Sequence, residues 1–94
     1  MSERDGVVRA VVRIINSQGL HARPISSFVK VCQGFDASVA VQGPGGEADG
    51  SSVLQMMGLG APQGSELVIE ASGPQASEVV AALEALVADG FGED

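Results

Sequence analysis

The sequence predicts an α+β fold in which a four-stranded antiparallel sheet carries three helices on one face. Short runs rich in β-branched residues alternate as strands do, and other stretches repeat apolar residues at helical spacing. Their order along the chain is strand, helix, strand, strand, helix, strand, helix, with short connections. Because an antiparallel sheet tolerates water on one side, we expect an open-faced two-layer sandwich.

The first strand is expected over Val7–Ile15, where one face carries Val8, Ala10, Val12 and Ile14. Turn-forming residues at Asn16–Gly19 end this strand. The first helix is expected over Ala22–Gln33, because apolar residues recur at the spacing i, i+3, i+4, i+7, namely at Ile25, Phe28, Val29 and Cys32. Pro24 lies in the first turn, where its missing N–H costs nothing, and Gly34 is a natural stop.

A hairpin is expected next, with strands over Ala37–Gln42 and Glu47–Asp49 on either side of a glycine-rich turn. A short helix over Val53–Met57 then follows Ser52, whose hydroxyl suits an N-cap. Four of its five residues are apolar, and we expect one or two of them to be exposed because so short a helix cannot bury them all.

The fourth strand is expected over Leu67–Ala71, and the last helix opens at Pro74 with Ser72 or Gly73 as its cap. The apolar stripe of that helix consists of Val79, Val80, Leu83, Leu86 and Val87. We expect Gly90–Asp94 to be a frayed tail. No linker divides the chain, so residues 1–94 form a single domain with an ordered core over about residues 7–89.

Composition excludes several classes of function. Five basic residues face twelve acidic ones, for a net charge of −7, which disfavours nucleic-acid binding. Cys32 is the single cysteine, and without a Cys/His cluster we expect no metal and no cofactor. The apolar runs are too short for a membrane span and the first residues do not form a secretory signal, so we expect a cytoplasmic protein.

The chemistry is expected at His21, the only histidine, where the first strand gives way to the first helix. Backbone N–H groups at a helix start, here those of Ala22 and Arg23, lack intrahelical acceptors and favour an anion. The Arg23 guanidinium and the helix start disfavour a protonated ring, so a nitrogen lone pair stays available, and both then stabilise a phosphoryl group. The alternative interpretation is that His21 is a helix N-cap or an ordinary surface histidine.

Three motifs and the order of elements resemble the HPr family, the histidine phosphocarrier proteins of the phosphoenolpyruvate-dependent phosphotransferase system. Gly19–Pro24 resembles the family's active-site signature, and the stretch Ser52–Gly60 resembles its regulatory-serine segment. Gln63–Leu67 is similar to the family's turn into the last strand. The resemblance covers roughly residues 7–88. It implies that the open-faced sandwich has the strand and helix arrangement of the HPr fold.

By this resemblance, His21 accepts a phosphoryl group on Nδ1 from phosphorylated enzyme I and passes it to an enzyme IIA-type protein. The Arg23 side chain would stabilise the phosphate, and the backbone N–H groups of Ala22 and Arg23 would bind it. Ser52 matches a serine that an HPr serine kinase phosphorylates in many relatives, which makes such a kinase a further candidate partner. The residues expected to dock partners are Lys30, Val53, Leu54 and Met57. The resemblance thus implies a monomeric carrier, not an enzyme.

The main alternative is a regulatory binding module of a nitrogen-type or incomplete relay, tuned by phosphorylation at His21 or Ser52, without sugar transport. Relatives often carry lysines around the histidine, whereas Gln33, Ser51 and Gln55 stand at such positions here, so the docking surface is less basic. A pure binding module would not need histidine and arginine two residues apart, which favours the carrier. A metabolic enzyme is disfavoured because the chain has neither a carboxylate pair beside a base nor a Walker-type glycine loop.

Overall fold

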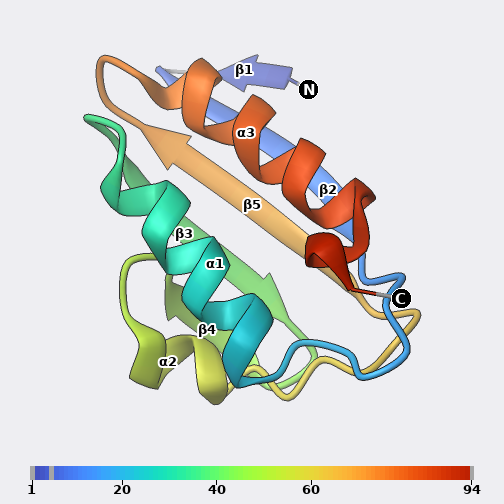
Figure 1. The fold of residues 1–94 in the computed structure, drawn as a ribbon. Coiled ribbons are helices and arrows are strands. Elements are labelled where there is room, and N and C mark those ends of the chain that lie inside the picture. Colours follow the sequence, from blue (N-terminus) through green and yellow to red (C-terminus); the bar gives the residue numbers. More distant parts are fainter. Residues whose placement is uncertain (1, 5, 94) are drawn as a thin grey trace.

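One antiparallel sheet forms the back of the molecule, and the three α-helices lie together on its front face (Figure 1). The computed structural model describes residues 2–4 and 6–93. The long strands are β2 (Val7–Arg13), β3 (Ser38–Gly43) and β5 (Glu66–Ser72), with the shorter β4 (Gly46–Asp49). The helices are α1 (Ala22–Gln33), α2 (Val53–Met57) and α3 (Ala76–Ala88). The predicted open-faced sandwich is confirmed, and both α1 and α2 have the predicted bounds.

The sheet has one strand more than expected. Residues Ser2–Arg4 form β1, which pairs antiparallel with β2 and gives the order β1-β2-β5-β3-β4. Without β1, the N–H and C=O groups along one edge of β2 would lack partners, a common liability of edge strands. No helix in the described part of the chain is long and apolar enough to cross a membrane.

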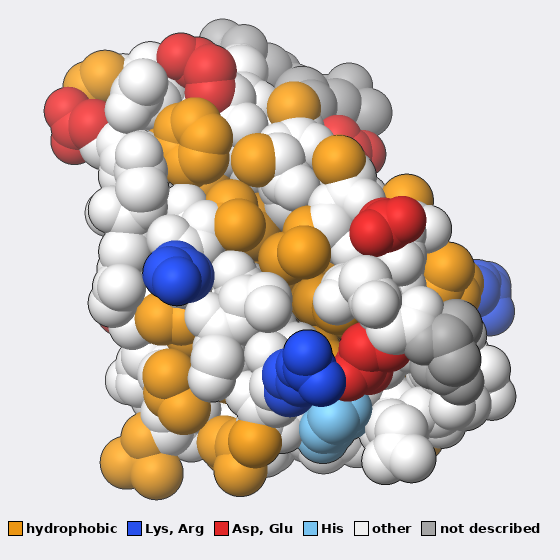
Figure 2. All heavy atoms as spheres, in the orientation of Figure 1, with side chains coloured by type: hydrophobic (Ala, Val, Ile, Leu, Met, Phe, Trp, Pro, Cys, Tyr) orange, Lys and Arg blue, Asp and Glu red, His pale blue; other side chains and the backbone are white. Residues whose placement is uncertain are grey.

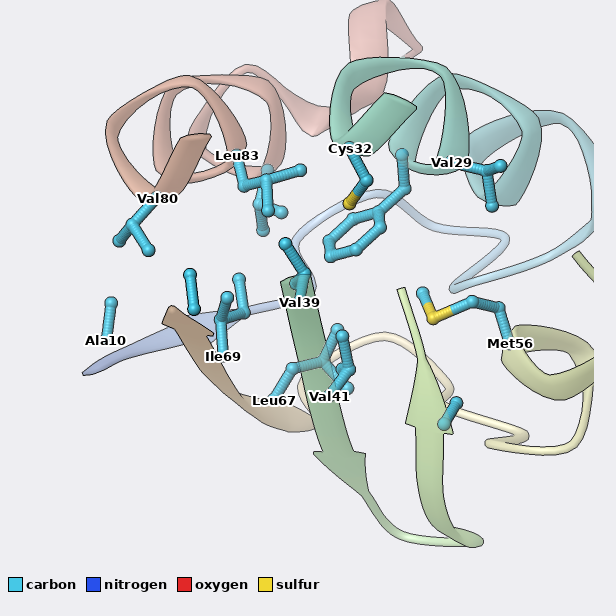
Figure 3. Close-up of a cluster of buried hydrophobic side chains, with 14 of the residues drawn as sticks. Ala10, Val29, Cys32, Val39, Val41, Met56, Leu67, Ile69, Val80 and Leu83 are labelled. Carbon is cyan, nitrogen blue, oxygen red and sulfur yellow. The ribbon is translucent and has the colours of Figure 1, made fainter. Parts of the chain in front are cut away.

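The hydrophobic core fills the space between the sheet and the helices (Figure 3). Leu83 of α3 points down toward the sheet, on which Val41 and Ile69 lie, and Val29 of α1 points down on the side of Met56 in α2. Cys32 is buried among them, as predicted, and burial, together with the nearby charge of Asp49, raises the pKa of its thiol to about 12. The core is therefore built mainly from aliphatic residues, with Phe28 and Phe91 as its buried aromatic residues, as the aromatic-poor composition requires.

The other face of the sheet is open to water, as predicted. Arg9 lies 3.7 Å from Glu70 and Arg13 lies 3.2 Å from Glu66, in cross-strand ion pairs between β2 and β5. Between the two pairs, Val11 is 51% exposed. These exposed ion pairs add little stability, so the fold depends on the helical face.

The last helix begins later than the sequence predicted. Gln75 occupies the N-cap position of α3. The expected opening at Pro74 and the expected cap at Ser72 or Gly73 are therefore wrong. The reason is a tertiary contact: the Gln75 N–H donates to the Asp36 carbonyl at 3.0 Å, and its side-chain oxygen accepts from the Asp36 N–H at 2.8 Å. This clamp holds the chain out of the helix until Ala76.

Candidate functional site

The loop between β2 and α1 is braced by a second loop across the molecule. Gly19 has a φ of 71°, and a Cβ there would lie 2.7 Å from the Ala61 carbonyl oxygen, so glycine is required. The next N–H, that of Leu20, donates to the same carbonyl at 2.8 Å, and the Leu20 side chain is buried. These contacts fix the position of the following residue, His21.

His21 is the N-cap residue of α1, with extended φ and ψ of −112° and −171°. Its carbonyl accepts from the Ile25 N–H at 3.0 Å, but its side chain makes no capping hydrogen bond. The imidazole is 38% exposed. Figure 2 shows the histidine at the surface, between a basic and an acidic side chain. The N-cap interpretation thus explains the backbone of His21 and leaves its ring available.

The first turn of α1 suits an anion. The N–H groups of Ala22 and Arg23 have no acceptor within the helix, and Pro24 has no N–H at all. No acidic residue lies in this turn, and the helix dipole adds a partial positive charge at its start. The ring of His21 therefore projects from a locally positive helix end.

A hollow of about 370 Å³ opens beside this ring. It is lined by Ser17, Gln18, His21, Arg23, Phe91, Gly92 and Glu93. The structure thus brings His21 and Arg23 to one cavity, as the sequence motif suggested. No described residue accepts a hydrogen bond from the exposed Arg23 guanidinium, so this cation can turn toward an anion in the hollow.

The sequence analysis missed Glu93. One of its carboxylate oxygens, Oε1, lies 3.2 Å from Nε2 of His21 and 2.9 Å from Nδ2 of Asn16. The Asn16 side chain is fully buried and also donates to the Gly19 carbonyl at 2.7 Å. The expectation of a frayed tail is therefore wrong for the described residues 90–93.

A buried phenylalanine explains why the tail is ordered. Residues Gly90–Gly92 form a short 3₁₀ turn, η1, in which Phe91 is only 9% exposed and joins the core. A lone large apolar residue just beyond the end of α3 was the available signal in the sequence. It predicts packing but not which residue the following carboxylate contacts.

The other predicted residues lie on α1 and α2. The hydroxyl of Ser52 accepts from the Gln55 N–H at 3.1 Å, which confirms the predicted N-cap. On α2 the exposed apolar side chains are Val53 (45%), Leu54 (84%) and Met57 (51%), whereas Met56 is fully buried. Three apolar side chains are thus exposed, more than the one or two expected, because a single face of α2 meets the core.

These exposed side chains form what we call the α2 patch, defined as Val53, Leu54 and Met57. Helix α2 packs against α1 beside its N-terminal end, and Figure 2 shows hydrophobic side chains gathered over this region, next to the histidine. Lys30 is exposed in the last turn of α1, about 13 Å along the helix from His21 at 1.5 Å per residue. The structure therefore places the α2 patch near the ring and Lys30 farther away.

A larger hollow, of about 550 Å³, lies at the end of the sheet near β3 and β4. Its lining includes Glu47, Asp49 and Glu70 but no histidine, lysine or arginine. It is thus unsuited to an anion. In the part of the chain that the structure describes, no group of three or more His, Cys, Asp or Glu side chains could hold a metal ion.

Comparison with known proteins agrees with this geometry. A family model described as the PTS HPr component phosphorylation site matches residues 8–89. Phosphocarrier protein NPr of Escherichia coli K12 is 41% identical over 88 residues, which cover 93% of this chain and 98% of that protein. Phosphocarrier protein HPr of Vibrio cholerae is 41% identical over 76 residues, covering 81% of this chain and 89% of that one.

Solved structures give the same result for the fold. The crystal structure of an HPr from Thermoanaerobacter tengcongensis superposes with a TM-score of 0.87 at 31% identity, covering 93% of this chain and 98% of that chain. The crystal structure of a phosphocarrier protein HPr from Bacillus anthracis superposes with a TM-score of 0.83 at 30% identity, covering 88% and 99%.

Proposed function

Because this chain belongs to the HPr family of phosphocarrier proteins of the phosphotransferase system, we propose that His21 accepts a phosphoryl group from phosphorylated enzyme I and passes it to an enzyme IIA-type protein. The observation that carries the proposal is the half-exposed imidazole at the N-cap of α1, which shares one hollow with Arg23. The chain has no tyrosine and no second histidine to compete for this role.

The positive charge of the helix start and of Arg23 favours both states of the carrier, the one with a free imidazole and the one with a phosphorylated imidazole. A neutral imidazole near pH 7 has a ring nitrogen with a free lone pair, which is the nucleophile. Once the phosphoryl group is attached, the N–H groups of Ala22 and Arg23 and the Arg23 guanidinium stabilise its negative charge. Because the guanidinium is exposed, water screens it. The phosphoryl group is therefore held weakly enough to be passed on.

The α2 patch supports docking by large partner proteins. Val53, Leu54 and Met57 expose apolar surface beside the histidine, and methionine adapts its shape to different surfaces. Lys30 adds a positive charge at the far end of α1. With few basic residues nearby, we propose that enzyme I and enzyme IIA-type proteins bind chiefly through apolar contacts, to a monomer in the cytoplasm.

Ser52 is the second candidate for modification. Its hydroxyl caps α2 and is partly exposed, and it immediately precedes the α2 patch. A phosphate here would place about two negative charges on the docking surface. We therefore propose that a serine kinase, where one is present, weakens partner docking through Ser52.

A regulatory module of a nitrogen-type or incomplete relay is the second candidate function. Two observations support retaining it. The surface around His21 carries few basic residues, and phosphocarrier protein NPr of Escherichia coli K12 is 41% identical over 93% of this chain. Both candidates use the same phosphohistidine, and they differ in the protein that takes the phosphoryl group.

The test is transfer of labelled phosphate from phosphoenolpyruvate through purified enzyme I. Wild type should take up one phosphoryl group, while His21→Ala should take up none and keep its circular dichroism spectrum, because the half-exposed ring supports no core packing. The label should be lost in acid and kept in base, as expected of a phosphohistidine. Labelling of His21→Ala at the wild-type rate would contradict the proposal, and acid-stable label would point to Ser52.

The second stage of the same assay separates the two candidate functions. Labelled wild type is mixed with each IIA-type protein of the host. Rapid transfer to a sugar-specific IIA protein supports the transport relay, whereas transfer confined to a regulatory IIA protein supports the alternative.

A further inference from the structure

We propose that Glu93 is a positioning residue for the phosphoryl acceptor: its carboxylate holds the His21 ring with the proton on Nε2 and so leaves Nδ1 as the nucleophile. The part of this inference that concerns phosphoryl transfer rests on the proposed function. The inference rests on the contact between Glu93 and His21 at the start of α1, two residues that are 72 positions apart in the sequence.

The chemistry of the contact assigns the proton. Glu93 Oε1 lies 3.2 Å from Nε2 of His21. An ionised carboxylate has no proton to donate, so Nε2 must be the donor and must carry the hydrogen. In a neutral ring the second nitrogen, Nδ1, then has the free lone pair. The contact therefore selects one of two tautomers before any partner binds.

The carboxylate is itself held in place. The same Oε1 accepts a hydrogen bond of 2.9 Å from Nδ2 of Asn16, which is fully buried. The Asn16 amide group is in turn fixed by its 2.7 Å bond to the Gly19 carbonyl, in the loop that leads to His21. The side chain of Glu93 is only 17% exposed. The ring is thus oriented through a chain of hydrogen bonds anchored inside the protein.

The backbone of the tail is bent to make this contact. Gly90, Phe91 and Gly92 all have positive φ, of 63°, 59° and 74°, and phenylalanine rarely adopts such a conformation. Burial of Phe91 compensates for the strain and turns the chain back toward the site. Unusual backbone conformations of this kind cluster at functional sites, and Phe91 adopts one directly beside the contact between Glu93 and His21.

With this arrangement, phosphoryl transfer to His21 needs no movement of the proton on Nε2. The Nδ1 lone pair forms the new P–N bond while the P–N bond of the donor phosphohistidine breaks, and its electron pair returns to the donor ring. His21 then carries the phosphoryl group on Nδ1 and its original proton on Nε2, with a positive charge spread over the ring. The Glu93 carboxylate stabilises that charge, as the aspartate of a Ser-His-Asp triad stabilises an imidazolium. Onward transfer is the reverse step, and the Nε2 proton never leaves.

The test compares Glu93→Ala and Glu93→Gln in the full-length chain, with Glu78→Gln as the control. Glu78 is an exposed glutamate in the first turn of α3, so the control makes the same charge change away from the hollow. At about pH 8, where a histidine ring is largely neutral, NMR of wild type should show a downfield Nε2–H resonance from the charged hydrogen bond. That resonance should vanish in Glu93→Ala and move upfield in Glu93→Gln, whose neutral oxygen can still accept.

The rate of labelling by enzyme I gives the second measurement. Loss of a group that orients a histidine typically costs ten- to a hundredfold, so Glu93→Ala should be labelled about tenfold more slowly, with partial rescue in Glu93→Gln. An unchanged Nε2–H resonance and an unchanged rate in Glu93→Ala would overturn the inference. If wild type itself takes up no label, the proposed function fails, while the NMR comparison still decides whether Glu93 sets the tautomer.

Discussion

At the scale of single residues, the site combines the proposed nucleophile, His21, with two side chains of opposite charge. Arg23 and Glu93 both line the hollow beside His21, and Glu93 contacts one ring nitrogen, Nε2. The cation thus favours the phosphoryl group and the carboxylate favours the ring that has received it. A carrier has to give its group away, and water screens the exposed Arg23 guanidinium, so this cation does not hold the group permanently.

Arg23→Ala tests the first of these charges. We expect acceptance of phosphate to slow by about tenfold, or roughly 1.4 kcal/mol, as for loss of one hydrogen bond to a charged group. Labelling should slow but not stop, because the helix start and the imidazole remain. Arg9→Ala, which removes an arginine from the open face of the sheet, serves as the control. Equal rates in the two variants would reduce Arg23 to an ordinary surface charge.

At the scale of elements, α2 has two separate tasks in five residues. Met56 faces the core and is fully buried, whereas the neighbouring Leu54 is 84% exposed. Ser52 starts the helix with a capping bond that is worth about 1 kcal/mol in typical proteins. The element is therefore stabilised from one side and exposes the other, where we propose that partners dock.

Truncating each of the two residues should separate these tasks. Leu54→Ala should leave the melting temperature nearly unchanged and weaken binding to enzyme I, because the side chain contributes docking area and no core packing. Met56→Ala should instead lower the free energy of unfolding by about 2–5 kcal/mol, the usual cost of truncating a buried side chain. Thermal melts and titration calorimetry measure the two effects. Loss of stability without loss of affinity in Leu54→Ala would contradict the assignment.

At the scale of the whole molecule, one hydrophobic core links the sheet to every α-helix. Cys32 belongs to this core, so the pKa of its thiol depends on whether the protein is folded. The thiol lies near Gly50, just after β4: a Cβ added at Gly50 would lie 3.1 Å from its sulfur and 2.9 Å from Val39 of β3. In the folded protein, burial first and the charge of Asp49 second raise its pKa from 9.0 to about 12. The unfolded chain therefore loses a proton at lower pH than the native protein does.

This difference predicts a loss of stability in alkali. Below about pH 9 both states keep the proton and the thiol does not affect folding; between about pH 9 and 12 only the unfolded state ionises. The free energy of unfolding should then fall with rising pH by up to about 1.4 kcal/mol per unit. The chain has no tyrosine and a single lysine, so few other groups titrate in this range.

Urea denaturation at several pH values measures the slope, with Cys32→Ala as the control. The variant should be less stable overall, because it leaves a small cavity, but its stability should depend less on pH above 9. Equal slopes in the two proteins would show that the thiol ionises as readily in the native state as in the unfolded chain.

Much of this molecule is decided by local sequence. The periodicity of apolar residues fixes α1 at its observed bounds, because burial of one face repeats every three to four residues. The capping hydroxyl of Ser52 marks the start of α2. The motif around His21 and Arg23 likewise lies within one loop and one helical turn, so its residues are close in space whatever the rest of the chain does. The site predicted from sequence is therefore the part that local geometry can specify.

The tertiary structure alone decided the rest. The clamp between Gln75 and Asp36 sets the start of α3, and the burial of Phe91 brings Glu93 to the ring. These contacts join residues far apart in sequence, and a local pattern carries no information on which distant groups will meet. A carboxylate in a polar C-terminal segment looks like a solvated charge until the chain folds back. That is why the sequence could single out His21 as the candidate nucleophile, whereas the partner of its Nε2 nitrogen emerged from the packing of residues 90–93.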